Sequence, residues 1–326
     1  MANKYKRILV LFILIFSFTI GCDNKQNKSS SDRDITNDSI ASNESQKKIN
    51  DTISIIGVGD IMMGSNYPSN ALPPNDGEDI FSDVKDVLSD ADITFGNLEG
   101  PLLTKGGTPK ICGPGSHCVA FRMPEHYAEY LKDAGFDIVS IANNHANDMG
   151  KEGRISTHNT LDKYEIGFAG QTDCPAYTFE CKGIKFGFAA FSPSINTCSI
   201  NDLDKAIEIV GNLAKEVDVV IVSFHGGGEG ASFQHVTGNR EFFLGENRGN
   251  VYEFAHGLID AGADVILGHG PHVPRAIEVY KGKFIAYSLG NFCTYAKFGL
   301  YGVLGVAPIV KIFVDKNVLV LKICLF

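Results

Sequence analysis

The chain has 326 residues, of which 44% are hydrophobic and 21% are charged. This is an ordinary globular composition, and the length suits one large domain or two small ones. The formal net charge of −9 argues against nucleic acid as a partner, because proteins that bind phosphate backbones present a basic surface.

The first 22 residues have the pattern of an export signal. Three basic residues precede an apolar run from Ile8 to Ile20, which is too short to span a bilayer comfortably. The run ends at Gly21-Cys22 and resembles a bacterial lipoprotein signal, so Cys22 is expected to carry a lipid that holds the protein to the membrane. An uncleaved anchor or a plain signal peptide is the alternative. Each of these places the remaining chain outside the cytoplasm, at the bacterial cell envelope.

Residues 23–51 are rich in Asn, Ser, Asp, Lys and Gln and contain almost no large apolar side chain. Such a segment cannot bury enough surface to offset its ordering entropy, so it is expected to be a disordered polar tether. A folded domain is predicted over residues 52–326. Its last residues form an apolar run without a polar tail, which favours a chain that is truncated at the C-terminus.

The eight cysteines are widely scattered, which argues against a zinc ribbon because that fold needs paired CxxC knuckles. The close spacings of Cys112 with Cys118 and of Cys174 with Cys181 favour two local disulfides in an oxidising compartment. Free thiols are an equal alternative for either pair.

From residue 53 onward, strand patterns alternate with helical apolar spacing. Lys-Gly turns after residues 181 and 280 indicate antiparallel hairpins, and residues 305–326 are predicted to form a further hairpin. The fold class is therefore α/β with mixed sheets. A loop over residues 102–118 is long enough to act as a lid or substrate loop. Strands are expected over residues 53–60, 92–95, 138–142, 182–191 and 277–289, and helices over 80–88, 125–134, 203–214 and 252–258.

Six of the apolar runs end in polar side chains that could bind a ligand. Helix capping, for example by Asn147 and Asp148, explains one or two such cases. Six cases favour a common site, because ligands of α/β proteins meet beyond the carboxyl ends of the strands. The strand-end residues are Asp60, Asn97, Glu99, Asn143, Asn144, His145, His225, Glu229, His269, His272, Ser288 and Asn291.

Carboxylate, carboxamide and imidazole groups without a nearby thiolate favour one or two divalent ions such as Mn, Zn or Fe. Such ions could activate a water molecule and stabilise a transferring phosphoryl or acyl group. A serine triad is a poorer interpretation, because the sequence has no GxSxG elbow.

The motifs GDIMMG, GNLEGPL, NNHANDMG, SFHGGGEG, GHGPHV and YSLGNF occur in this order. They resemble the CapA family of capsule-synthesis proteins, which is related to the calcineurin-like metallophosphoesterases. The resemblance covers about residues 53–313 and implies a metallophosphoesterase-like sandwich of two mixed β-sheets flanked by helices. It also implies a role in synthesis, export or anchoring of poly-γ-glutamate or a related capsular polymer at the cell surface.

The resemblance assigns roles to individual residues. His145 is similar to the acid or transition-state stabiliser of the family's Asn-His motif. Asp60 is followed by Ile61 and Met62 where related phosphoesterases carry Asp-x-His, and the late Gly-His-x-His is stretched here by one residue, so the number of ions stays open. The implied metal ligands are Asp60, Glu99, Asn144, His225, His269 and His272, of which Asp60 and Glu99 would also serve catalysis with His145.

A further group of polar residues is interpreted as substrate-binding. Charged residues in the loop over residues 226–249 replace the family's commoner His-Trp-Gly form, although a solvated surface is the simpler alternative for them. Arg275, just past His272, could meet an anionic substrate. The full group is Asn97, Asn143, Glu229, His235, Arg248, Arg275 and Asn291.

Three functions are consistent with these features. The first is a surface-anchored metal-dependent hydrolase or transferase that acts on a capsular polymer or its carrier. The second is a non-catalytic subunit of a capsule synthase or export complex that keeps the metal pocket for binding. The third, a general extracytoplasmic phosphoesterase, is less favoured because the first-strand histidine is missing.

Overall fold

The computed structural model describes residues 52–112, 118–315 and 319–320. The expected signal sequence over residues 1–22, the lipidation site Cys22 and the tether over residues 23–51 lie outside the described residues. Within the described ranges, no helix is long and apolar enough to span a bilayer.

One sheet has seven strands in the order β15-β14-β1-β2-β3-β4, with β13 also paired to β1. The strands β1 to β4 and β13 run parallel to one another. Strand β14 pairs antiparallel with β1, and β15 pairs antiparallel with β14. The β14–β15 pairing confirms the predicted C-terminal hairpin. The strands are β1 (Ile53–Met62), β2 (Ile93–Leu98), β3 (Ile138–Ser140), β4 (Gly167–Ala169), β13 (Asn291–Thr294), β14 (Val310–Val314) and β15 (Leu319–Val320).

The second sheet has six strands in the order β11-β12-β10-β7-β6-β5. Its four inner strands are parallel, and antiparallel hairpins form both edges. Both hairpin turns are Lys-Gly pairs with positive φ, as a two-residue turn of this kind requires. The strands are β5 (Ala176–Cys181), β6 (Ile184–Phe191), β7 (Val219–His225), β10 (Val265–His269), β11 (Ile277–Tyr280) and β12 (Lys283–Ala286).

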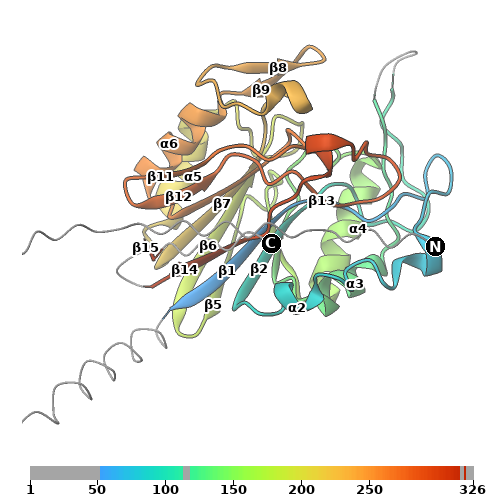
Figure 1. Cartoon of the computed structure of the whole chain (residues 1–326), viewed down its shortest axis with the longest axis horizontal. Helices are drawn as coiled ribbons and strands as arrows, with labels where there is room; N and C mark the ends of the chain where they lie inside the picture. Colours follow the sequence, from blue (N-terminus) through green and yellow to red (C-terminus); the bar gives the residue numbers. More distant parts are fainter. Residues whose placement is uncertain (1–51, 113–117, 316–318, 321–326) are drawn as a thin grey trace, which may run out of the picture.

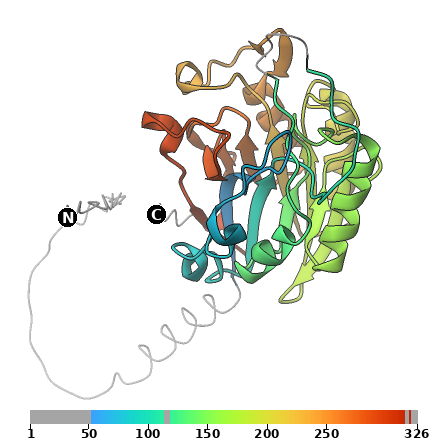
Figure 2. The same cartoon turned by 90° about the vertical axis from the view of Figure 1, so that its right-hand side faces the viewer.

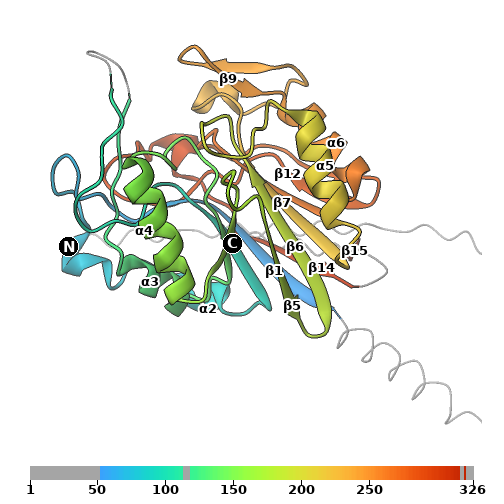
Figure 3. The same ribbon diagram turned by 180° about the vertical axis from the view of Figure 1, so that it is seen from behind.

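The two sheets pack face to face between layers of helices (Figures 1 and 3). Apolar side chains from both sheets, such as Phe95 and Phe188, fill the space between them. The helices α2 (Lys85–Leu88), α3 (Tyr127–Asp133) and α4 (Gly150–Lys163) cover the first sheet, and α5 (Leu203–Leu213) and α6 (Val251–Ala261) cover the second. The predicted α/β sandwich of two mixed sheets flanked by helices is confirmed.

A small hairpin of β8 (Glu241–Phe243) and β9 (Glu246–Gly249) stands apart from both sheets at the upper edge of the molecule in Figures 1 and 2. Neither this hairpin nor α4 was predicted from the sequence. The segment that forms α4 lacks a clear apolar period, and a contact with a distant loop helps to position it: the Thr157 hydroxyl accepts a hydrogen bond from the Leu102 amide at 2.9 Å. Three short 3₁₀ segments occupy Pro74–Gly77, Ala231–Phe233 and Gly302–Gly305.

The predicted helix over residues 80–88 is shorter in the structure and begins at Lys85. The residues before it form separate turns, in which the Ile80 amide bonds to the Gly77 carbonyl and the Val84 amide to that of Phe81. The apolar spacing is compatible with these turns as well as with a helix, because the turns also bury Phe81 and Leu88 under the first sheet.

One of the two expected disulfides is present. Cys112 and Cys118 are bonded, with their Cα atoms 5.4 Å apart. The Cys174–Cys181 pairing was wrong, since both thiols are free. Strand β5 runs from Ala176 to Cys181, and an extended segment of this length separates its ends by roughly 20 Å.

Candidate metal centre

The carboxyl ends of strands from both sheets bring four titratable side chains together. Asp60 lies near the end of β1, Glu99 directly follows β2, His225 ends β7, and His272 lies in the turn after β10. All four side chains are buried. Asp60 pairs in register with Asn97 of β2 and with Asn291 of β13, so β1 is the centre of this edge.

Gly59 allows the close backbone approach that positions Asp60. A Cβ atom at residue 59 would lie 2.1 Å from the Gly290 carbonyl oxygen. The absence of a side chain there lets the Asp60 amide donate to that same carbonyl at 2.8 Å. Glycine at this position therefore connects the first strand to the turn that precedes β13.

The donor atoms of Asp60, Glu99 and His272 lie within 4.8 Å of one another. His272 Nδ1 is 3.0 Å from Asp60 Oδ2, and His272 Nε2 is 3.7 Å from Glu99 Oε1. His225 Nε2 lies 3.9 Å from the same Glu99 oxygen. Two carboxylates and two imidazoles therefore converge on a small volume.

Several atoms of this group have no hydrogen-bond partner among the described residues. They include both carboxylate oxygens of Glu99 and Nε2 of His225, whereas Asp60 Oδ2 and His272 Nδ1 have only each other as an ion pair. The side-chain oxygen of Asn144, the residue before His145, is also buried without such a partner. A buried polar atom without a partner is costly, and the cost is greatest for a charged group. Carboxylate, imidazole and carboxamide donors fit a divalent ion of the Mn, Zn or Fe kind, which would satisfy these atoms.

His269 does not face this group. Its Nε2 atom is 3.0 Å from the Val58 carbonyl oxygen, and its Nδ1 atom is 3.4 Å from the Ser223 hydroxyl. Both ring nitrogens are therefore used between the sheets. His272 reaches the donor group instead, because Gly270 and His272 adopt positive φ angles of 110° and 57° and turn the chain back toward Asp60.

Asn97 and Asn143 support the site from behind. Asn97 donates to Asp60 Oδ1 at 2.8 Å and lies 3.3 Å from His225 Nδ1. Asn143 donates to the Leu98 carbonyl at 2.8 Å and to Asn97 Oδ1 at 3.3 Å. Both are completely buried. The structure thus places these two residues, interpreted from the sequence as substrate-binding, in a network that orients the donors.

His145 is held by two neighbours. Its Nδ1 atom lies 2.7 Å from Asp148 Oδ2, and its ring stacks on Phe121 with the centroids 4.1 Å apart. Its Nε2 atom lies 3.8 Å from Glu99 Oε1. The imidazole is therefore oriented with one nitrogen toward Asp148 and the other toward the metal-donor group.

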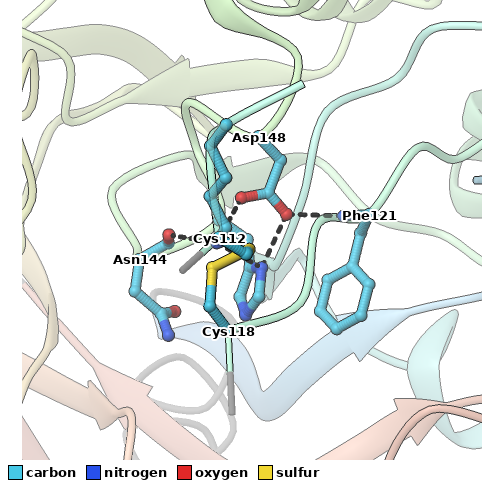
Figure 4. The surroundings of a disulfide bond; sticks show 7 residues. Cys112, Cys118, Phe121, Asn144 and Asp148 are labelled. Carbon is cyan, nitrogen blue, oxygen red and sulfur yellow. Dashed lines mark hydrogen bonds and ion pairs between the residues drawn. A yellow bond between two sulfur atoms is a disulfide. The ribbon is translucent and has the colours of Figure 1, made fainter. Parts of the chain in front are cut away.

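Asp148 has several further partners, and Figure 4 shows its contact with Phe121. Its Oδ2 atom accepts a hydrogen bond from the Phe121 amide at 2.6 Å, and its Oδ1 atom is 2.6 Å from Lys110 Nζ. Asp148 does not cap α4, whose N-cap residue Met149 makes no side-chain capping bond. The sequence did not indicate the role of Lys110. For Asp148 the only sequence signal of its contact with His145 was its position three residues further along the chain.

Burial and mutual charge shift the pKa values of the group. Burial raises the pKa of Glu99 well above its usual range, and burial lowers that of His225 well below. Burial also opposes protonation of His272, but the carboxylates of Glu99 and Asp60 outweigh it and raise the pKa of His272 to about 10. Burial alone would raise the pKa of Asp60, yet His272 brings it far below its usual range. Asp60 and His272 therefore form an ion pair when the site holds no metal.

A pocket of about 880 Å³ opens over this edge. Asn291 contributes to its wall and donates to the His272 carbonyl at 3.2 Å, which fixes the turn that carries this histidine. The β8–β9 hairpin contributes another part. Lining residues include Lys110, Phe121, Asn144, His145, Glu229, Phe243, Glu246, Arg248, His272, Asn291 and Lys297.

Two predicted substrate residues lie elsewhere. His235 is exposed and is not among the described residues that line the pocket. Arg275 is buried, and its two terminal nitrogens bond to the two oxygens of Glu241 at 2.9 and 2.7 Å. Glu241 also accepts a hydrogen bond from the Gly228 amide at 2.8 Å. Arg275 thus fixes the glycine-rich loop, and it is not among the described residues that line the pocket.

The fold and the buried donor group define a two-sheet α/β protein with a candidate metal centre at one sheet edge. Residues 54–296 match the family model of the bacterial capsule synthesis protein PGA_cap. The chain belongs to this family, as its motifs predicted.

Two curated relatives are named for capsule synthesis. The chain is 30% identical over 258 residues to the PGA biosynthesis protein CapA of Bacillus subtilis, covering 74% of this chain and 63% of that protein. It is 27% identical over 263 residues to the capsule biosynthesis protein CapA of Bacillus anthracis, covering 74% and 60%. The chain thus spans about three fifths of the length of these relatives.

A solved structure shares the fold. A hypothetical protein from Thermus thermophilus matches with a TM-score of 0.50 and 15% sequence identity, over 84% of this chain and 98% of that one. At this identity the likeness concerns the fold alone.

Proposed function

We propose that this protein is a metal-dependent hydrolase or transferase that acts on a capsular polymer, poly-γ-glutamate or polysaccharide, or on its carrier. The observation that carries the proposal is the set of buried donor atoms without partners beside an open pocket. Asp60, Glu99, Asn144, His225 and His272 would hold one or two divalent ions. When bound, such an ion supplies Lewis acidity and an activated water molecule.

His145 would move the proton. With Nδ1–H directed at Asp148, its Nε2 atom carries the lone pair and faces the donor group. Burial lowers the pKa of His145, so the neutral ring is ready at pH 7 to accept a proton at Nε2 from the nucleophile. The same atom then returns a proton to the leaving group.

The polymer is proposed from the family and from the names of the relatives, which refer to PGA and capsule biosynthesis. The export signal predicted for residues 1–22 favours a place in the cell envelope, and a lipid on Cys22 would be the membrane anchor. The Cys112–Cys118 disulfide supports an oxidising compartment. Subunits of a capsule synthase or exporter are the partners that follow from this role.

A non-catalytic binding subunit is the second candidate. Two observations favour it: Met62 occupies the position where related phosphoesterases carry a histidine, and His269 is turned away toward Val58. Both reduce the number of ligands. The general phosphoesterase has no observation of its own in its favour.

The test compares wild-type protein with His145→Ala and with the control His235→Ala, an exposed histidine outside the pocket. The size distribution of poly-γ-glutamate or capsular polysaccharide is measured after incubation, together with bound metal. We expect His145→Ala to lose about 100-fold or more in rate with metal retained, and the control to match wild type. Equal polymer turnover by wild type and His145→Ala would remove the catalytic role of this histidine.

A further inference from the structure

Arg248 in the pocket wall is a buried cation, and its Nη1 donor is unused within the described part of the chain. Its side chain is 5% exposed. The Nη2 atom donates to Glu229 Oε1 at 2.6 Å, and the Nε atom lies 2.7 Å from Glu246 Oε2. The Nη1 atom is buried and has no partner among the described residues.

The guanidinium group is held in a fixed plane. Two carboxylates contact two of its nitrogens, and its carbon lies 5.7 Å from the ring centroid of Phe243. The Arg248 carbonyl also accepts a hydrogen bond from the Gly227 amide at 2.8 Å, which ties β9 to the glycine-rich loop. The direction of Nη1 is therefore set before any ligand binds, and this lowers the entropic cost of binding.

Arg248 lies close to the candidate metal centre. Glu229, which accepts from Arg248, has its second oxygen 3.9 Å from His272 Nε2. Arg248, Glu229 and His272 all line the pocket. An anion bound by Nη1 would thus lie near the group that is proposed to carry out the chemistry.

Two other cations near the pocket, Lys110 and Arg275, differ from Arg248. Lys110 pairs with Asp148 at 2.6 Å, and Arg275 spends both terminal nitrogens on Glu241. Arg275 also keeps a buried Nε atom without a partner in the described residues, but this residue does not line the pocket. A buried guanidinium N–H without a partner is costly, and a ligand oxygen would remove the cost.

We propose that Arg248 anchors an anion subsite in this pocket, which takes a carboxylate or phosphate group of the substrate. The inference rests on the proposed function, because it assigns the ligand to the pocket of the metal centre. The fork of N–H donors on a guanidinium group suits the paired oxygens of a carboxylate or a phosphate. A γ-linked glutamate chain presents a carboxylate on every residue, and a carrier-linked substrate would present phosphate.

The experiment measures calorimetric binding of two probes, γ-linked triglutamate and inorganic phosphate, to the full chain. The proteins are wild type, Arg248→Gln, Arg248→Lys and the control Arg240→Gln, which changes an exposed arginine next to the same hairpin. Bound metal is determined in every sample. We expect Arg248→Gln to weaken binding of at least one probe about 10- to 100-fold, with metal content unchanged. Arg240→Gln should stay within about twofold of wild type.

The probe that responds identifies the anion as carboxylate or phosphate. If Arg248→Gln does not fold, Arg248→Lys supplies the reading, because it keeps the charge and loses the directed Nη1 donor. Equal affinity in wild type and the folded Arg248 variant, or no binding of either probe by wild type, would overturn the subsite. Wild type that stays free of metal after incubation with Mn or Zn, yet binds a probe through Arg248, would contradict the metal-dependent function and leave the subsite in place.

Discussion

The imidazole Nδ1 of His145 lies 2.7 Å from Oδ2 of Asp148, and this contact leaves Nε2 directed at Glu99. In other histidine–carboxylate pairs the acid likewise fixes the tautomer and the orientation of the base. Asp148 is therefore a positioning residue, which acts through His145.

We predict that Asp148→Asn lowers the rate of polymer turnover by about 100-fold without loss of bound metal. The amide can donate to Nδ1 and so favour the wrong tautomer, in which Nε2 carries the proton. The pH–rate profile should change together with the rate, which a merely structural role would not produce. Asp86→Asn, an exposed carboxylate on α2, is the control. An unchanged profile in Asp148→Asn would contradict the assignment.

Metal binding should release protons. The neighbouring carboxylates raise the pKa of His272 to about 10 in the metal-free site, so this histidine is protonated at pH 7 and must lose its proton to bind an ion. The apparent affinity for Mn or Zn should therefore rise with pH between about 6 and 8. Calorimetry in buffers of different ionisation enthalpy counts the protons, and we expect about one or more per ion. A binding enthalpy that is the same in all buffers would show that the ion displaces no proton from His272.

Gly59→Ala should destabilise the fold by about 3 kcal/mol or more, because the new Cβ atom would lie 2.1 Å from the Gly290 carbonyl oxygen. Gly211→Ala is the control. Its Cβ atom would have its nearest neighbour at 3.7 Å, and the residue lies within α5, so a gain of about 0.5–1 kcal/mol is expected. Urea unfolding of both variants gives the comparison. A Gly59→Ala protein as stable as wild type would mean that β1 and the Gly290 turn can separate without cost.

The cysteines should react in two classes. Alkylation of denatured protein without reductant is expected to label Cys174 and Cys181 and to spare Cys112 and Cys118. Mass spectrometry of the peptides gives the result. Labelling of Cys112 and Cys118 in protein prepared from an oxidising compartment would contradict the presence of that disulfide.

The parts of the fold that depend on the conformational preferences of neighbouring residues could be predicted from the sequence. Lys182-Gly183 and Lys281-Gly282 adopt the positive φ angles that tight hairpins need, and this requirement is visible in the residues themselves. Helix α4 was missed because its segment is polar and is positioned by distant contacts, including Thr157 with Leu102. No periodicity in a single segment can report such a contact.

The same division applies to the site. Asp60, Glu99 and His225 could be predicted because parallel strands deliver their carboxyl ends to one edge. Which histidine of Gly-His-Gly-Pro-His meets Asp60 depends on the left-handed φ of His272, and the spacing does not determine it. The partner of Arg275, Glu241, lies in a hairpin distant in sequence, so its structural role was equally hidden.

The most direct measurement is the elemental metal content of the purified protein, for wild type beside Asp60→Ala, His225→Ala and the control His235→Ala. We predict near-stoichiometric transition metal in wild type and in the control, and its loss in the other two variants while all four remain folded. A folded wild-type protein that stays free of metal after incubation with Mn or Zn, or equal metal in all four proteins, would contradict the metal centre.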